Sequence, residues 1–80
     1  MLHVSVISPE ATLFEGDAAS VVAPAFDGEL GILTGHAAMV TVLGKGTLKV
    51  GDGASFVVEG GFLQVVDNRV RVVTEKAAKI

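Results

Sequence analysis

The sequence predicts an all-β protein, a small flattened β-sandwich or barrel of antiparallel strands with at most a short helical tail at the C-terminus. Apolar and polar residues alternate with a period of two over much of the chain, which is the pattern of half-buried strands. Turn-forming residues separate these runs at short and regular intervals. At 80 residues the chain has room for one hydrophobic core, so we expect a single domain over residues 1–80.

The alternation places the strands along the chain. It is clear near the N-terminus, where Leu2 and Val4 flank His3, and near the C-terminus, where Arg69 and Arg71 flank an apolar residue. The predicted strands cover residues 2–6, 20–25, 39–43, 47–50, 54–59, 62–66 and 69–72. Only residues 75–80, "EKAAKI", have the composition of a helix, and so short a segment is not stable as an isolated helix.

Glycine and asparagine mark the connections between these strands. Gly44-Lys45-Gly46, Gly51-Asp52-Gly53 and Asp67-Asn68 offer the positive φ that tight hairpins require, so successive strands are predicted to pair antiparallel. Gly60-Gly61 interrupts what would otherwise be one long strand. Glycine there costs about 0.5–1 kcal/mol relative to alanine, so we expect a bulge, a kink or the close approach of another backbone.

Composition argues against several classes of function. A net charge of −3 has the wrong sign for binding phosphate backbones, so no nucleic-acid partner is expected. Without cysteine there is no disulfide, thiolate chemistry or cysteine zinc site. No apolar run is long enough for a bilayer span and no signal peptide is evident, so we expect a soluble protein. Half of the residues are hydrophobic and the mean hydropathy is +0.61, which predicts that some apolar surface meets a partner.

The stretch "FDGELGILTGHAAMV", residues 26–40, contains the candidates for catalysis. His36 follows Thr34, and Asp27 and Glu29 lie upstream. Residue types alone do not make a nucleophile, base and orienting group, so a structural or interface histidine is favoured. A small hydrolase that uses His36 is kept as an alternative.

Phosphate, metal and prosthetic-group sites have weaker signals. Gly28, Gly31 and Gly35 lack the following helix and lysine of a phosphate loop, so we expect them to shape the backbone. His3 has no other ligand type close in sequence, so metal binding is not expected. Lys45, on a predicted turn, leaves open a biotinyl or lipoyl-type carrier domain, although its glycine neighbours do not resemble those of carrier domains.

Two longer stretches carry a resemblance to a known family. They are "GELGILTGHAAMVTVLGKGTLKV" (residues 28–50) and "VEGGFLQVVDNRVRVVTEKA" (residues 58–77), and the opening "VSVISPEATLFEGDAASVVAP" agrees with them. These residues resemble the N-terminal β-sandwich domain of the epsilon subunits of rotary F-type ATP synthases, which have a G-x-x-G-I-L-P-G-H-A-P loop and an S-G-G-F-x-E-V segment. Thr34 and Ala38 stand where proline is usual, Glu59 where serine is common and Gln64 where glutamate is usual. The missing prolines predict a less rigid loop.

The resemblance implies a non-catalytic subunit of the central stalk that links the γ subunit to the membrane c-ring of a proton-translocating ATP synthase. It implies a hetero-oligomer without a cofactor, held peripherally at the cytoplasmic face of a bacterial plasma membrane and touching the membrane only through the ring. The implied c-ring contacts are Asp27, Glu29, Leu30 and Ile32, and the implied γ contacts are His36, Ala37, Met39, Gly60, Gly61 and Phe62.

Subunits of this family continue into a two-helix C-terminal element that restrains hydrolysis and in some members binds ATP. The present sequence stops at Ile80. We expect no C-terminal helical hairpin domain within these residues, which are either a short form of the subunit or the trimmed N-terminal domain of a longer one. We do not infer inhibition or nucleotide binding for them.

Overall fold

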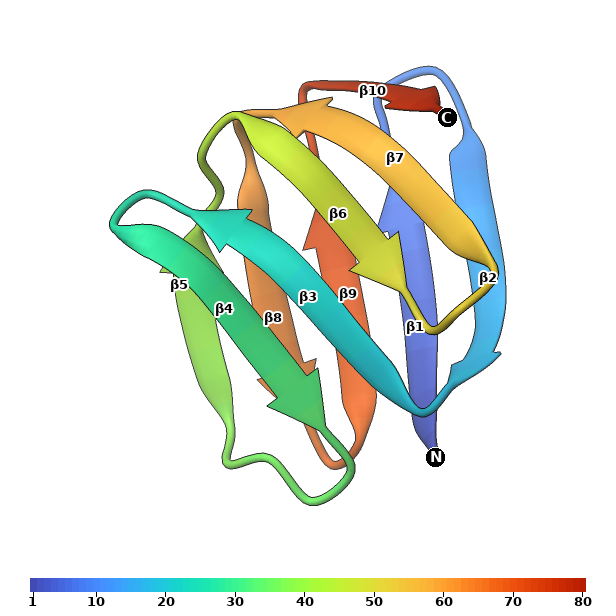
Figure 1. Cartoon of the computed structure of the whole chain (residues 1–80), viewed down its shortest axis with the longest axis vertical. Helices are drawn as coiled ribbons and strands as arrows, with labels where there is room; N and C mark the ends of the chain where they lie inside the picture. The colour runs from blue at the N-terminus through green and yellow to red at the C-terminus, as the bar shows by residue number, and fades with distance from the viewer.

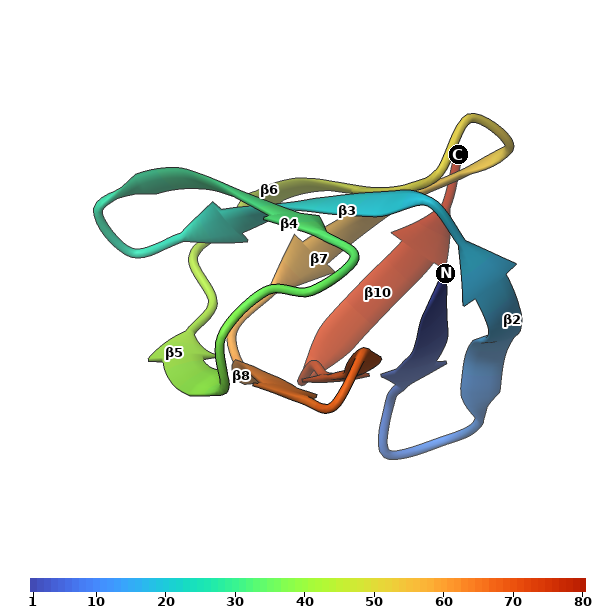
Figure 2. The ribbon, with the colours of Figure 1, turned by 90° about the horizontal axis from the view of Figure 1, so that it is seen from below.

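The computed structural model describes all residues, 1–80. The chain forms ten β-strands, which are arranged in two five-stranded sheets. Sheet A has the strand order β2-β1-β9-β8-β5, and sheet B has the order β10-β7-β6-β3-β4. The strands are β1 (Leu2–Ile7), β2 (Thr12–Ala18), β3 (Ser20–Ala25), β4 (Gly28–Leu33), β5 (Met39–Val42), β6 (Gly46–Val50), β7 (Ala54–Glu59), β8 (Phe62–Val66), β9 (Arg69–Val73) and β10 (Lys76–Lys79). The sheets lie face to face (Figure 1 and Figure 2). The predicted all-β sandwich is confirmed.

The core fills the space between the two sheets. Alternate residues of each strand point inward, so Leu2 and Val4 of β1 are fully buried while His3 between them is exposed. The rings of Phe14 in β2 and Phe56 in β7 meet edge to face with their centroids 6.4 Å apart, and so join the two sheets. The 16 buried apolar side chains form one cluster.

One pair of strands is parallel, whereas the sequence predicted only antiparallel pairing between successive strands. β1 and β9 run in the same direction, with Val4 opposite Val70 and Val6 opposite Val72. β1 lies between its hairpin partner β2 and the late strand β9. A tight turn imposes antiparallel pairing on strands that follow each other in the chain, and no such turn joins β1 to β9.

Two of the three predicted hairpin turns are confirmed. Asp67 and Asn68 have φ angles of 49° and 61° and join β8 to β9, and Gly51, with φ of 59°, begins the turn from β6 to β7. The prediction for residues 44–46 is wrong, because this segment leads from β5 in sheet A to β6 in sheet B. Glycine is required there by packing: a Cβ on Gly44 would lie 3.0 Å from the Ala25 carbonyl oxygen.

The prediction of a helical tail is also wrong. Lys76–Lys79 form β10, which pairs antiparallel with β7 at the edge of sheet B. Alanine and lysine favour a helix, but the segment is too short to nucleate one, whereas the edge of β7 offers unpaired backbone donors and acceptors. β2 and β4 are not among the strands predicted from the sequence. No helix in the structure has the length and apolar character needed to cross a bilayer.

Candidate interaction surfaces

The β3–β4 hairpin carries the residues implied to face the c-ring. Asp27 and Glu29 are exposed at its tip, and Phe26 beside them is 74 % exposed. Leu30 is half-buried against the core, and Ile32 is fully buried within it. The surface of this tip, which extends from one end of the sandwich (Figure 1), therefore consists of two carboxylates and the phenyl ring, which the sequence analysis did not select.

His36 lies on the loop of residues 34–38, which leads from β4 in sheet B to β5 in sheet A. Its backbone N–H donates to the Leu33 carbonyl at 3.1 Å, and its Nδ1 donates to the carbonyl of the exposed Ala37 at 2.8 Å. The Gly35 N–H donates to Asn68 Oδ1 at 2.7 Å, so the β8–β9 turn holds this loop. The imidazole thus stabilises a turn, and part of its surface stays accessible.

The structure does not assemble a catalytic set around His36. Asp27 and Glu29 lie at one end of β4 and the His36 loop lies at the other (Figure 1). The only hydrogen bond of the imidazole goes to a backbone carbonyl of its own loop. A nucleophile and its base must lie within hydrogen-bond reach, so the hydrolase alternative has no support from this geometry.

An apolar strip covers the β5 side of the outer face of sheet A. Its members, which we call the β5–β8 strip, are Val40, Val42, Phe62 and Val66, and their exposed fractions are 67, 59, 40 and 41 %. Val42 and Phe62 are direct partners across the two strands. Met39 points the other way and packs against the core. Exposed apolar patches of this kind mark interaction sites.

Gly60 and Gly61 connect β7 in sheet B to β8 in sheet A, and both have positive φ, 74° and 96°. A Cβ on Gly61 would lie 2.7 Å from Thr74 Cα and closer still to the Val73 carbonyl oxygen. The Leu43 N–H donates to the Gly61 carbonyl at 2.9 Å. The expected close approach of another backbone is confirmed, and that backbone belongs to the same chain. The contact of this pair with γ stays a prediction.

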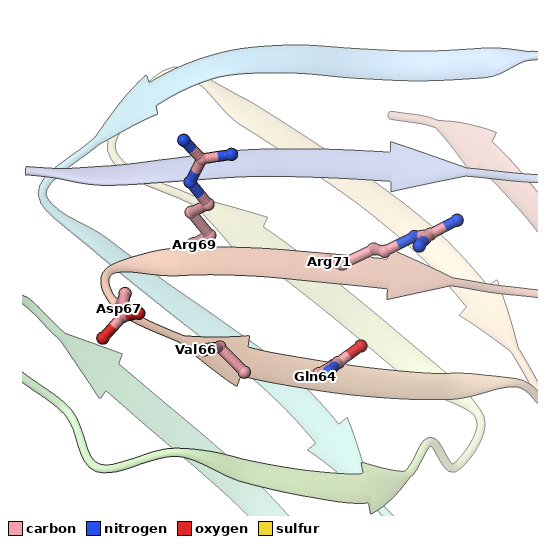
Figure 3. A pocket seen from close by; sticks show the side chains of 5 residues that line it. All are labelled: Gln64, Val66, Asp67, Arg69 and Arg71. Atoms are coloured by element: carbon pink, nitrogen blue, oxygen red, sulfur yellow. The ribbon is translucent and has the colours of Figure 1, made fainter.

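Arginine side chains occupy the middle of the outer face of sheet A. Arg69 and Arg71 leave β9 on the same side, and with Gln64, Val66 and Asp67 they line an open hollow of about 560 Å³. Figure 3 shows Arg69 reaching toward β1, Arg71 extending along β9 and Gln64 pointing toward Arg71. No function was predicted for these arginines from the sequence.

His3 lies beyond the arginines on the same face. Its Nδ1 is 3.2 Å from Asp17 Oδ1 and its Nε2 is 3.5 Å from Glu15 Oε2, both on β2. No other ligand type lies close to His3 in the sequence, but the β1–β2 hairpin brings these carboxylates to it across the strand pair. No three His, Cys, Asp or Glu side chains are grouped so that they could hold a metal ion.

Lys45, the residue of the carrier alternative, has an exposed side chain whose Nζ lies 3.7 Å from Glu59 Oε1. It lies on the connection from β5 to β6, and this connection joins the two sheets because β5 belongs to sheet A and β6 to sheet B. The carrier alternative depended on a lysine at a hairpin tip, and this structure does not provide one.

Comparison with known sequences agrees with the resemblance. The family described as "ATP synthase, Delta/Epsilon chain, beta-sandwich domain" matches residues 1–80. The ATP synthase epsilon chain of Leptospira borgpetersenii serovar Hardjo-bovis is 45 % identical over 80 residues, which cover 96 % of this chain and 63 % of that relative. The ATP synthase epsilon chain of Caulobacter vibrioides is 37 % identical over 81 residues, which cover 98 % of this chain and 94 % of that relative.

Solved structures share the fold. A chain in the structure of Euglena gracilis mitochondrial ATP synthase, OSCP/F1/c-ring in rotational state 1, matches with a TM-score of 0.88 and 26 % identity, covering 98 % of this chain and 52 % of that chain. A chain of the Tetrahymena thermophila mitochondrial ATP synthase central stalk/c-ring matches with a TM-score of 0.83 and 21 % identity, covering 96 % and 65 %. The present chain thus spans only 63 % of the Leptospira relative. Its full-length family match shows that the chain belongs to the β-sandwich domain family of ATP synthase delta and epsilon chains.

Proposed function

We propose that this chain is a non-catalytic rotor subunit of an F-type ATP synthase, which links the γ subunit to the c-ring and transmits ring rotation to γ. The observation that carries the proposal is the family match over all of residues 1–80. The similarity to a chain in the Euglena F1/c-ring assembly supports it. In this role the chain needs no cofactor, and it lies peripherally, at the cytoplasmic face of the membrane in a bacterium.

A linking role needs two separate contact surfaces, and the fold supplies two candidates. The β5–β8 strip and the neighbouring His36 loop offer apolar and half-buried groups suited to the γ subunit. The β3–β4 tip offers Asp27 and Glu29, which suit basic groups on the loops of the ring. We assign the first surface to γ and the second to the c-ring.

The γ contact can be tested with two valine variants of the purified chain. Val42 belongs to the β5–β8 strip, whereas Val57 is a comparably exposed strand valine of sheet B and serves as the control. Val42→Glu should weaken binding to the γ subunit of the same organism by about tenfold or more, because the contact would bury an unpaired carboxylate. Val57→Glu should bind like the wild type. Absence of wild-type binding, or equal losses in both variants, would refute the assignment.

The ring contact is tested by measuring coupling in an ATP synthase reconstituted with each variant of the chain. Glu29→Lys is compared with Asp52→Lys, which makes the same change of charge at the β6–β7 turn. We expect Glu29→Lys to lower proton pumping per ATP hydrolysed by about twofold, a modest effect because the carboxylate is exposed. Asp52→Lys should leave the ratio unchanged, and identical behaviour of the two variants would argue against this surface.

A further inference from the structure

The outer face of sheet A holds two adjacent cations that the chain does not neutralise. Arg69 and Arg71 are two positions apart on β9, so their side chains share one face about 7 Å apart. Only His3 and Lys45 lie within ion-pair distance of a carboxylate. Asp67 lines the same hollow, yet it forms no ion pair with either guanidinium. Two like charges therefore share one face of a chain whose net charge is −3.

Strand register orders this face into zones. One row across the sheet reads Val66, Arg69, His3 and Asp17, and the next reads Val40, Gln64, Arg71, Ser5 and Glu15. Each row passes from the apolar strip, through an arginine, to a carboxylate. The carboxylates at the far side are held by His3, which lies between them and the arginines. The arginines are thus left facing outward, next to the strip.

We propose that Arg69 and Arg71 bind carboxylates of the γ subunit, on a segment whose neighbouring apolar side chains cover the β5–β8 strip. This inference rests on the proposed function, because it extends the γ surface by one strand. Guanidinium groups bind carboxylates through paired N–H donors, and arginine is enriched in the cores of protein interfaces. The adjoining valines favour a protein segment over a small anion, because a free anion would leave the strip exposed.

The inference predicts which charges matter and how salt affects them. We compare wild type, the double variant Arg69→Gln/Arg71→Gln and the control Lys49→Gln/Lys76→Gln, whose exposed lysines lie on sheet B. Both double variants lower the net charge by the same amount. Binding to the purified γ subunit is measured at 50, 150 and 500 mM NaCl, where the Debye screening length is about 14, 8 and 4 Å. Circular dichroism verifies that each variant is folded.

At the lowest salt, the arginine variant should bind γ about 10- to 100-fold more weakly than wild type, and its affinity should change less with salt. The lysine variant should stay within about twofold of wild type, with the same salt dependence. If both double variants lost the same affinity for γ, the loss would be explained by net charge alone and the inference would be overturned. Wild-type binding by the arginine variant would also overturn the inference. If Val42→Glu still weakened binding in that case, the assignment of the β5–β8 strip to γ would stand without the arginines. Failure of wild type to bind would overturn both proposals.

Discussion

Two of the regions where the chain crosses between its two sheets contrast with each other. At one end of the sandwich, three connections meet in what we call the crossover corner, residues 43–46, 59–61 and 73–76 (Figure 1). There the Leu43 N–H donates to the Gly61 carbonyl, and the buried Thr74 hydroxyl donates to the Lys76 carbonyl at 2.9 Å. At the other end, the loop of residues 34–38 also crosses between the sheets, but it is largely exposed and is tied to the β8–β9 turn through Asn68.

The comparison shows that glycine is present for different reasons in the two regions. At the corner, the place of a Gly61 side chain is taken by the backbone of residues 73 and 74. Near the exposed loop, a Cβ on Gly31 or Gly35 would meet no atom within 4 Å. The fold itself requires the corner glycine, whereas the surface around the loop is open to a partner.

The sharpest test of the corner is Gly61→Ala, for which we expect the largest loss of stability. Even a methyl group would overlap the backbone of residues 73 and 74, and φ of 96° adds strain. We expect a cost of about 4 kcal/mol or more, which is much of the stability of a small domain. Urea unfolding at 25 °C measures it.

Gly60→Ala is the matched control for that measurement. Its Cβ would meet the Glu75 side chain at 3.2 Å, and that flexible side chain can move away. The remaining cost comes from φ of 74° and should be about 1–2 kcal/mol. If both variants unfolded at the same urea concentration, positive φ alone would explain the pair and the close approach would be unimportant.

The sequence identified the strands that have a well-buried face, and it missed three of the four strands at the sheet edges; the fourth, β5, shows the alternation although none of its residues is fully buried. β1 and β9 alternate between buried and exposed residues, so the pattern is visible. Ala18 is the only buried residue of β2, Ile32 is the only one of β4, and β10 has none. An edge strand gains its stability from one neighbour and from backbone pairing, and neither leaves a periodic signal in the sequence.

The candidate surfaces divide in the same way. The carboxylates of the β3–β4 tip and His36 lie in one continuous motif, so the sequence could single them out. The β5–β8 strip and the arginine pair depend on which strands are neighbours in sheet A. That pairing joins residues far apart in the chain, and alternation alone does not specify it.

The exposed loop can be probed by removing its tie to the β8–β9 turn. Asn68→Gly keeps a residue that accepts φ of 61° but deletes the oxygen that binds the Gly35 N–H. Asn68→Asp keeps an acceptor and tolerates the same φ. We expect Asn68→Gly to lower stability by about 1 kcal/mol and to speed hydrogen exchange at the Gly35 amide, while Asn68→Asp resembles wild type. Unchanged exchange in Asn68→Gly would show that the loop is ordered without this bond, despite lacking the prolines usual at positions 34 and 38.

The smallest effect is expected at Gly31, and its sign is the informative part. Gly31 lies on edge strand β4, its φ is not in the left-handed region, and nothing would contact its Cβ. Gly31→Ala should therefore leave the fold intact and raise its stability by about 0.4–1 kcal/mol, because alanine restricts the unfolded chain. Thermal unfolding measures this change against that of Gly61→Ala. A loss of stability at Gly31 would mean that the open region is as constrained as the corner, and the contrast between the two regions would then disappear.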